Sequence, residues 1–99
     1  MIIYCDLDET LCSLPADSRR YGEAVPIQKN IQKINKLYNA GHTIVIWTAR
    51  GKTTGVEWRV VTEYQLKKWG VKYHALSFDK PEFDVLIDDK AKNIDMVEA

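Results

Sequence analysis

Residues 2–11 read IIYCDLDETL, an apolar run that ends in three carboxylates and a hydroxyl. Residues 2–6 are short, apolar and partly β-branched, which is typical of a strand buried on both faces. Asp is a poor strand former, and burying an unpaired carboxylate costs several kcal/mol. The stretch therefore predicts either a strand that delivers ligands to a site or an exposed turn after a strand.

The composition is that of an ordinary globular protein. Hydrophobic residues make up 45% of the 99 residues and charged residues 28%, and this length leaves no room for a second domain. Fourteen basic residues balance fourteen acidic ones, so no net field favours nucleic acid or an anionic membrane. We expect a single domain over residues 1–99 without general affinity for nucleic acid.

Nothing in the sequence indicates export or a membrane anchor. The two cysteines, Cys5 and Cys12, are too few for a disulfide scaffold, and they lack the spacing of a metal site. The predicted strand begins at once, without the basic and apolar regions of a signal peptide, and no apolar run is long enough to cross a bilayer. We expect a cytoplasmic protein without membrane contact.

The rest of the chain alternates predicted helices with predicted strands after a loop over residues 13–25. Apolar residues at helical spacing, with Pro at the start and Gly at the end, favour the first of these helices. The remaining strands are short apolar runs. The predicted helices cover residues 26–41, 55–69 and 91–98, and the later strands cover 43–47, 71–78 and 84–88.

Alternation of this kind predicts a three-layer α/β/α domain with a parallel sheet, similar in arrangement to the Rossmann fold. Parallel strands end at one edge of the sheet, and ligands bind beyond that edge. Asp6, Asp8, Thr48, Asp88 and Asp89 all lie at or just after predicted strand ends. We expect these residues, although distant in the sequence, to form one site.

Four carboxylates at one edge repel one another unless a cation or shared protons compensate their charge. Oxygen ligands without His or Cys suit a hard ion, so Mg²⁺ is the expected cofactor. Asp6 could then attack a phosphoryl group and form an aspartyl-phosphate, while Asp8 serves as general acid and base. Thr48 could bind a phosphate oxygen, and Lys80 could balance negative charge.

Four segments of the chain resemble the motifs of the haloacid dehalogenase (HAD) superfamily, in the same order and on the corresponding elements. They are DLDET at residues 6–10, IVIWTAR at 44–50, Lys80, and VLIDD at 85–89. The resemblance covers essentially the whole chain, and its first motif is the most specific. The second Asp of that motif favours the phosphatase branch, because the dehalogenases lack this acid and base.

The resemblance also implies a role for each matching residue. Asp6 would be the nucleophile and a Mg²⁺ ligand, and Asp8 would bind Mg²⁺ through its backbone carbonyl. Thr48 and Lys80 would hold the phosphoryl group. Asp88 would complete the metal site. Asp89 would contact the metal directly or through water. Ala49 and Arg50, which follow Thr48, are also expected next to the substrate.

Two further features narrow the expected substrate and assembly. The segments DKPEFDVLIDDKA and LKKWGV are similar to small HAD proteins labelled capsule-biosynthesis or sugar-phosphate phosphatases. The loops after the first two motifs are too short for a cap domain, as in the capless members of the superfamily. We expect a small sugar phosphate as substrate, with a nucleotide as the alternative. We also expect a free sheet edge, exposed or paired in a homo-oligomer.

Less specific interpretations stay open for several residues. Asp6 and Asp8 could form an exposed turn, and Lys80 could be a solvated loop residue. Arg50 could contact the substrate or be simple surface charge, and the same holds for Arg19, Arg20 and Lys52. As a whole, the chain could also be a phosphate- or metal-sensing module that accepts a phosphoryl group without turnover. A third alternative is a subunit whose activity needs a partner's surface.

Overall fold

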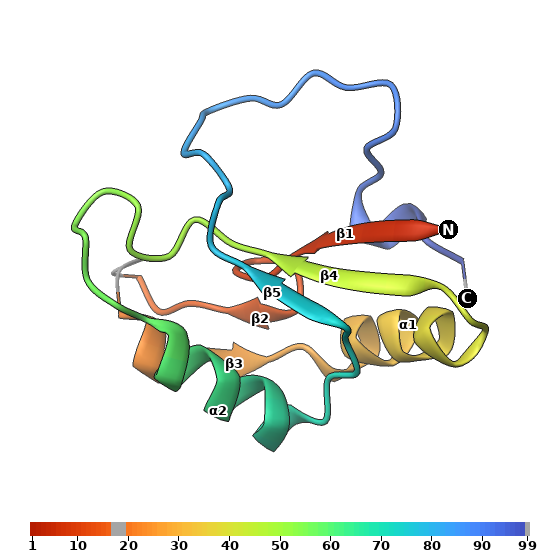
Figure 1. Ribbon diagram of the computed structural model, residues 1–99, viewed down its shortest axis with the longest axis horizontal. Coiled ribbons are helices and arrows are strands. Elements are labelled where there is room, and N and C mark those ends of the chain that lie inside the picture. Colours follow the sequence, from red (N-terminus) through yellow and green to blue (C-terminus); the bar gives the residue numbers. More distant parts are fainter. Residues whose placement is uncertain (17–19, 99) are drawn as a thin grey trace.

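A parallel sheet of three strands organises the chain in the computed structural model, which describes residues 1–16 and 20–98. The strand order is β1-β4-β5, and β1 pairs with β4 from Ile2 opposite Thr43 to Asp6 opposite Trp47 (Figure 1). The predicted strands at 2–6 and 43–47 are confirmed, and the predicted strand at 71–78 is shorter. The strands are β1 (Ile2–Asp6), β4 (Thr43–Trp47) and β5 (Ala75–Ser77).

Two predicted helices are also confirmed, as α1 (Gln28–Asn39) and α2 (Arg59–Trp69). The first begins after Pro26 rather than at it, because Pro26 belongs to a short strand. The second ends at Gly70, whose φ of 74° suits the left-handed cap that glycine adopts without strain. Both helices were therefore predicted to within a few residues at each end.

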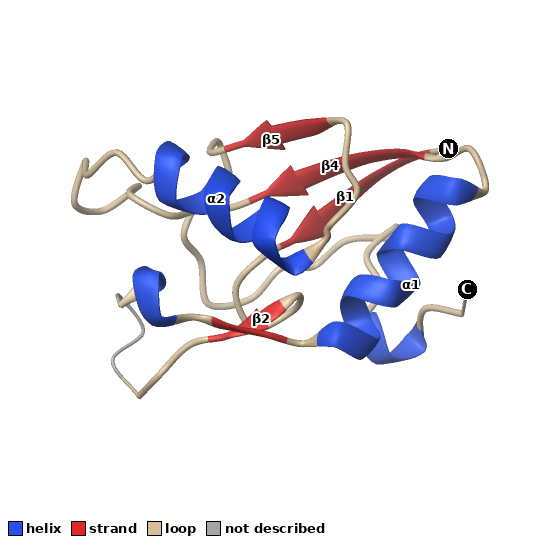
Figure 2. Cartoon of the chain, turned by 90° about the horizontal axis from the view of Figure 1, so that it is seen from below, coloured by secondary structure: helices blue, strands red, loops and turns tan. Residues whose placement is uncertain are grey.

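Both helices lie on the same face of the sheet (Figures 1 and 2). Ile44 and Ile46 of β4 are fully buried on this face, and Ile31, Ile34 and Leu66 of the helices belong to the same core. No helix of the described residues covers the opposite face. The α/β class and the parallel sheet are therefore confirmed, whereas the described residues form two layers rather than the predicted three.

The prediction of a strand at residues 84–88 is wrong for the single chain. Residues 78–93 instead leave the sheet and form an extended segment, here called the arch (Figure 1). Six residues, 78–83, separate Ser77 from the predicted strand. A parallel crossover needs about a dozen residues or more. This connection is therefore too short to return the chain to the end of the sheet at which the parallel strands begin.

Short elements complete the chain on either side of these main features. The loop predicted at 13–25 contains a small antiparallel pair, which the sequence did not indicate. The predicted terminal helix at 91–98 is confirmed only as one 3-10 turn. The short elements are β2 (Cys12–Ser13), η1 (Tyr21–Glu23), β3 (Val25–Pro26) and η2 (Ile94–Met96). No helix of the described residues is long and apolar enough to cross a bilayer.

Candidate active site

The loop after β1 explains why an apolar strand ends in carboxylates. The Leu7 carbonyl accepts hydrogen bonds from the N–H groups of Thr10, Leu11 and Cys12 at 3.2, 2.8 and 3.3 Å, which turns the chain tightly around Leu7. The side chains of Leu7, Leu11 and Cys12 are fully buried. Burial of these apolar groups anchors the loop, so Asp6 keeps its carboxylate at the end of the strand.

The Asp6 carboxylate lies among three donors. Its Oδ1 accepts hydrogen bonds from the Leu7 N–H and from Lys80 Nζ, both at 2.9 Å. Its Oδ2 accepts a longer hydrogen bond of 3.4 Å from the Thr10 hydroxyl. The side chain of Asp6 is nonetheless 38% exposed. This carboxylate is therefore oriented by its neighbours and still accessible to a ligand.

Lys80 is held next to Asp6 by aromatic rings. Its Nζ lies 5.5 Å from the centroid of the Trp47 ring and 5.4 Å from that of the Phe83 ring. Its side chain is only 15% exposed. Cation–π contacts of this kind are worth about 0.5–2 kcal/mol, so they favour this position of the long side chain. The predicted proximity of Lys80 to the first motif is thus present in the structure.

Asp8 forms a two-pronged ion pair with Arg50. Arg50 Nη2 donates to Asp8 Oδ1 at 2.8 Å, and Nε donates to Asp8 Oδ2 at 3.0 Å. Arg50 Nη1 donates to Thr62 Oγ1 at 2.9 Å and to Gln65 Oε1 at 2.7 Å. Its guanidinium also lies 4.9 Å from the centroid of the Tyr21 ring. The Arg50 side chain is fully buried, so its observed partners are protein groups.

The segment after β4 contributes the next two candidates. The Thr48 N–H donates to the Ser77 carbonyl at 2.9 Å, which extends the sheet contact beyond β4. The Thr48 hydroxyl accepts a hydrogen bond of 3.2 Å from the backbone N–H of Arg50. This bond fixes the turn through Ala49 and brings the backbone after Thr48 to the same edge of the sheet as Asp6.

A cavity of about 550 Å³ joins these residues. Six of the eight predicted site residues line it, and they come from three segments of the chain: Asp6, Asp8, Thr48, Ala49, Arg50 and Lys80. The first part of the arch closes one side. A cavity with carboxylates, a hydroxyl and an ammonium group at its base can bind a phosphoryl group and offer it a carboxylate nucleophile.

The other two predicted site residues, Asp88 and Asp89, do not reach this cavity. Both are exposed on the arch, since the strand predicted to carry them does not form. The backbone N–H of Lys90 donates to Asp88 Oδ1 at 2.9 Å, and this hydrogen bond is the main cause that lowers the pKa of Asp88 below its ordinary value. The predicted cluster of four carboxylates is therefore absent from the described part of a single chain.

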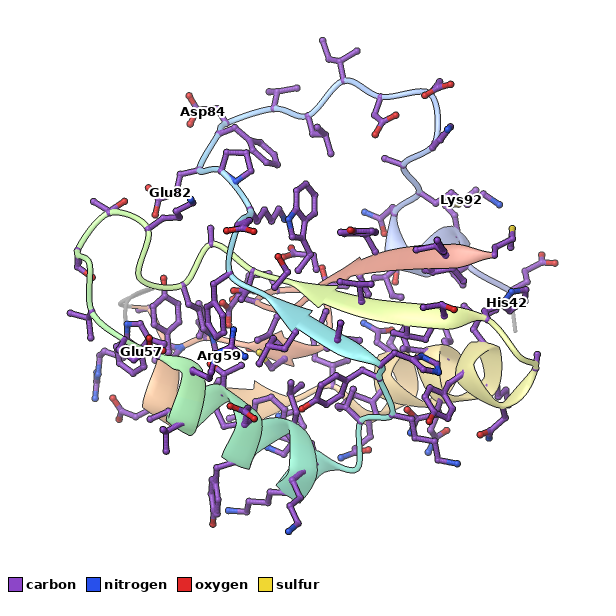
Figure 3. The ribbon with its side chains drawn as sticks, viewed as in Figure 1. His42, Glu57, Arg59, Glu82, Asp84 and Lys92 are labelled. Carbon is purple, nitrogen blue, oxygen red and sulfur yellow. The ribbon has the colours of Figure 1, made fainter. Side chains whose placement is uncertain are left out.

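Other residues at the cavity were missed from the sequence. Glu82 and Asp84 of the arch line it (Figure 3). Tyr21 lines it as well. Asn30 of α1 donates from Nδ2 to the Thr10 carbonyl at 2.8 Å and so fastens the first-motif loop to the helix. Thr10 itself lies in the quoted first motif. The others carry no sequence signal, because their places depend on how the arch and loops fold.

The remaining basic candidates lie in different places. Arg20 forms an ion pair with Glu23 on the surface. Lys52 lines a smaller cavity of about 220 Å³ next to the larger one, with Arg50 between the two. Arg19 falls outside the described residues. Of the two that the structure describes, Lys52 therefore lines a cavity that shares Arg50 with the candidate site.

The donor atoms at this edge suit a hard cation. Mg²⁺ usually keeps several waters and takes one or two carboxylates together with substrate phosphate. The part-exposed Asp6 carboxylate and the backbone carbonyl of Asp8 fit this demand, whereas the Asp8 carboxylate is occupied by Arg50. The described residues contain no group of three or more His, Cys, Asp or Glu side chains that could hold a metal.

The two thiols below the site give a prediction for alkaline pH. Burial, together with the negative charge of the neighbouring Asp6 and Asp8, raises the pKa of Cys5 and of Cys12 from 9.0 to about 12. At pH values between 9.0 and about 12, the thiols of the unfolded chain bind fewer protons than those of the folded chain. The free energy of unfolding should therefore fall as the pH rises above about 9, by about 1.4 kcal/mol per pH unit for each thiol.

Urea unfolding at pH 8, 9 and 10 measures this slope. Cys12→Ala is the informative variant, because it removes one thiol and its contribution to the slope while every other ionisable side chain stays in place. Equal slopes for the variant and the wild type would show that Cys12 ionises as readily in the folded chain as in the unfolded one.

Comparisons with known proteins bear on the fold alone. The chain is similar to a protein from Vibrio cholerae whose crystal structure is known, with a TM-score of 0.82 and 24% sequence identity. The match covers 95% of this chain and 84% of that one. No protein-family model and no curated protein matches the chain. The likeness supports the α/β arrangement described above. It carries no information on the chemistry of the site.

Proposed function

We propose that this chain is a Mg²⁺-dependent phosphomonoester hydrolase of the HAD type, with the minimal capless core of that superfamily, and that it acts through an aspartyl-phosphate. One observation carries the proposal: the accessible Asp6 carboxylate lies 2.9 Å from Lys80 Nζ in a cavity that Asp8 and Thr48 also line. These residues come from three segments, and the resemblance assigns each of them a role in phosphoryl transfer.

The proposed reaction has two steps. In the first, an Asp6 oxygen attacks the phosphorus, the bond from phosphorus to the substrate oxygen breaks, and a protonated Asp8 gives its proton to that leaving oxygen. In the second, a water attacks the phosphorus of the aspartyl-phosphate, Asp8 accepts the water's proton, and the bond from phosphorus to the Asp6 oxygen breaks. Inorganic phosphate then leaves, and the Asp6 carboxylate is restored.

The other residues act on charge and position. Lys80 is held by Trp47 and Phe83, so its ammonium group stays in place to offset the charge on the phosphoryl oxygens. The Thr48 hydroxyl can donate to one of these oxygens. A bound Mg²⁺ would supply further positive charge to the phosphoryl group.

A small phosphorylated metabolite, foremost a sugar phosphate, is the proposed substrate. The cavity of about 550 Å³ falls within the range of about 300–1,000 Å³ that holds small-molecule ligands. The balanced charge of the chain favours no polyanionic substrate. A nucleotide would occupy the same cavity, and the substrate panel described below distinguishes the two.

One observation favours a second candidate function. Both carboxylate oxygens of Asp8 accept hydrogen bonds from Arg50, which restricts the very group that must donate and accept protons. A phosphoacceptor module needs the Asp6 nucleophile but gains a longer-lived phosphoryl group when the neighbouring carboxylate is restrained. In that case Asp6 would be phosphorylated and would release phosphate only slowly.

Phosphate release from an aryl phosphate, a set of sugar phosphates and a set of nucleotides tests the proposal. We expect turnover with Mg²⁺, a loss of about 100-fold or more with EDTA, and recovery when Mg²⁺ is added back. Acid quenching of the same reactions measures the phosphoenzyme. A stable phosphoenzyme without turnover would establish the acceptor module instead, and neither product nor phosphoenzyme from the folded protein would contradict both functions.

A further inference from the structure

The sheet has a free edge at the strand that carries the site. All five residues of β1 pair with β4 on one side, and no strand of the described residues pairs with the other side. On the face without helices, the side chains of Ile2 and Tyr4 are 72% and 58% exposed. A free edge with apolar residues beside it is a ready template for pairing with another strand.

The arch contains a segment with the composition of a strand but without a neighbour in the sheet. Val85, Leu86 and Ile87 follow one another, and these residues are 73%, 49% and 94% exposed. Three consecutive apolar residues in water are unfavourable unless another surface covers them. Their continuous apolar pattern is that of a buried parallel strand.

This segment cannot pair in parallel with β1 of its own chain, which is the direction that would bring Asp88 and Asp89 to Asp6. The arch runs from Glu82 and Asp84, near the carboxyl ends of the strands, toward Lys92, near their amino ends (Figure 3). It is therefore opposite in direction to β1. Six connecting residues cannot reverse this course, and antiparallel pairing within one chain would carry Asp88 and Asp89 away from Asp6.

We propose that two copies of the chain exchange these segments. Val85–Ile87 of each copy pairs in parallel with β1 of the other, which covers three apolar side chains and fills the free edge. The same pairing delivers Asp88 and Asp89 of the partner subunit to the carboxyl end of β1, beside Asp6 and Asp8. Each site is then completed in trans, and this second part rests on the proposed phosphatase function.

The chain itself supplies the argument for a second copy as the occupant. The free edge and the strand without a partner lie on the same molecule, so a two-fold dimer satisfies both in each copy. Fourteen basic and fourteen acidic residues give no net charge, so no overall repulsion opposes the approach of two copies.

Sedimentation velocity with a matched pair of variants tests the exchange without reference to activity. Val85→Asp removes an apolar residue of the exchanged segment, and Val60→Asp makes the same change on α2, where Val60 is 79% exposed. We expect the wild type and Val60→Asp to sediment as dimers and Val85→Asp as a folded monomer. A monomeric wild type, or a Val85→Asp dimer as stable as that of Val60→Asp, would overturn the exchange.

Mixed dimers test the site in trans. Asp6→Asn and the double variant Asp88→Asn/Asp89→Asn are co-expressed with different tags, and dimers that carry both tags are isolated. Exchange places the intact Asp6 of one copy beside the intact Asp88 and Asp89 of the other, so one of two sites works. We expect about half the wild-type phosphate release from the mixed dimer and little from either parent dimer.

The outcomes separate this inference from the proposed function. An inactive mixed dimer, or a fully active Asp88→Asn/Asp89→Asn dimer, overturns the completion of the site in trans. If the wild type hydrolyses no phosphomonoester, the proposed function fails, and sedimentation alone then decides whether the segments are exchanged.

Discussion

Asp6→Asn should lower phosphate release by about 10⁴-fold, because the amide cannot attack phosphorus and no second nucleophile lies at that position. The variant should still fold. Its amide oxygen can accept the hydrogen bond of the Leu7 N–H, and the variant loses the ion pair with Lys80 and the long hydrogen bond from the Thr10 hydroxyl. Since Asp6 is 38% exposed, that pair is worth about 1 kcal/mol or less. Initial rates with the best substrate of the panel measure the effect.

Asp79→Asn is the matched control, because Asp79 is exposed next to Lys80 but does not line the cavity. It makes the same chemical change close to the site, and its rate should stay within about twofold of wild type. A rate within tenfold of wild type for Asp6→Asn would show that Asp6 is not the nucleophile. An equal loss in both variants would point to a general effect of charge near the cavity.

The sequence predicted the parts of the fold that depend on local pattern. The strand at 43–47 is a continuous apolar run, and α1 carries apolar residues at helical spacing. The segment at 84–88 has the same continuous apolar pattern as residues 43–47, yet the prediction that it forms a strand is wrong for the single chain. Pattern shows that a segment can form a strand, whereas the connection after Ser77 decides whether a neighbouring strand lies within reach.

The site divides in the same way. Strand ends located Asp6 and Thr48, because parallel strands finish at a common edge. The partnership of Asp8 with Arg50 spans 42 positions and depends on where α2 places Thr62 and Gln65. No spacing in the sequence reports such a contact. Arg50 was predicted beside the substrate, and it does line the cavity, but its guanidinium is buried against Asp8 and α2, which the sequence did not indicate.

Arg50→Met should lower the free energy of unfolding by about 3 kcal/mol, because it leaves the largely buried Asp8 carboxylate without its partner. Thr62 Oγ1 and Gln65 Oε1 lose a donor in the same change. The free energy of unfolding of Arg50→Lys should lie between those of the wild type and Arg50→Met, since a lysine keeps the charge but cannot reproduce the two-pronged contact. Urea unfolding of the three proteins measures these differences.

Arg59→Met provides the comparison on α2. Arg59 is exposed and lies 4.9 Å from the centroid of the Phe78 ring, so its loss should cost about 1 kcal/mol or less.

Asp8→Asn combined with Arg50→Met should cost less than the sum of the two single changes, because each single change leaves the other group unpaired. Equal stability of Arg50→Met and Arg59→Met would show that the Asp8–Arg50 pair does not hold the first-motif loop in place. If the rate falls in step with stability from Arg50→Lys to Arg50→Met, unfolding explains the loss of activity. If the rate falls in Arg50→Lys while that variant is fully folded, Arg50 positions Asp8 for the reaction.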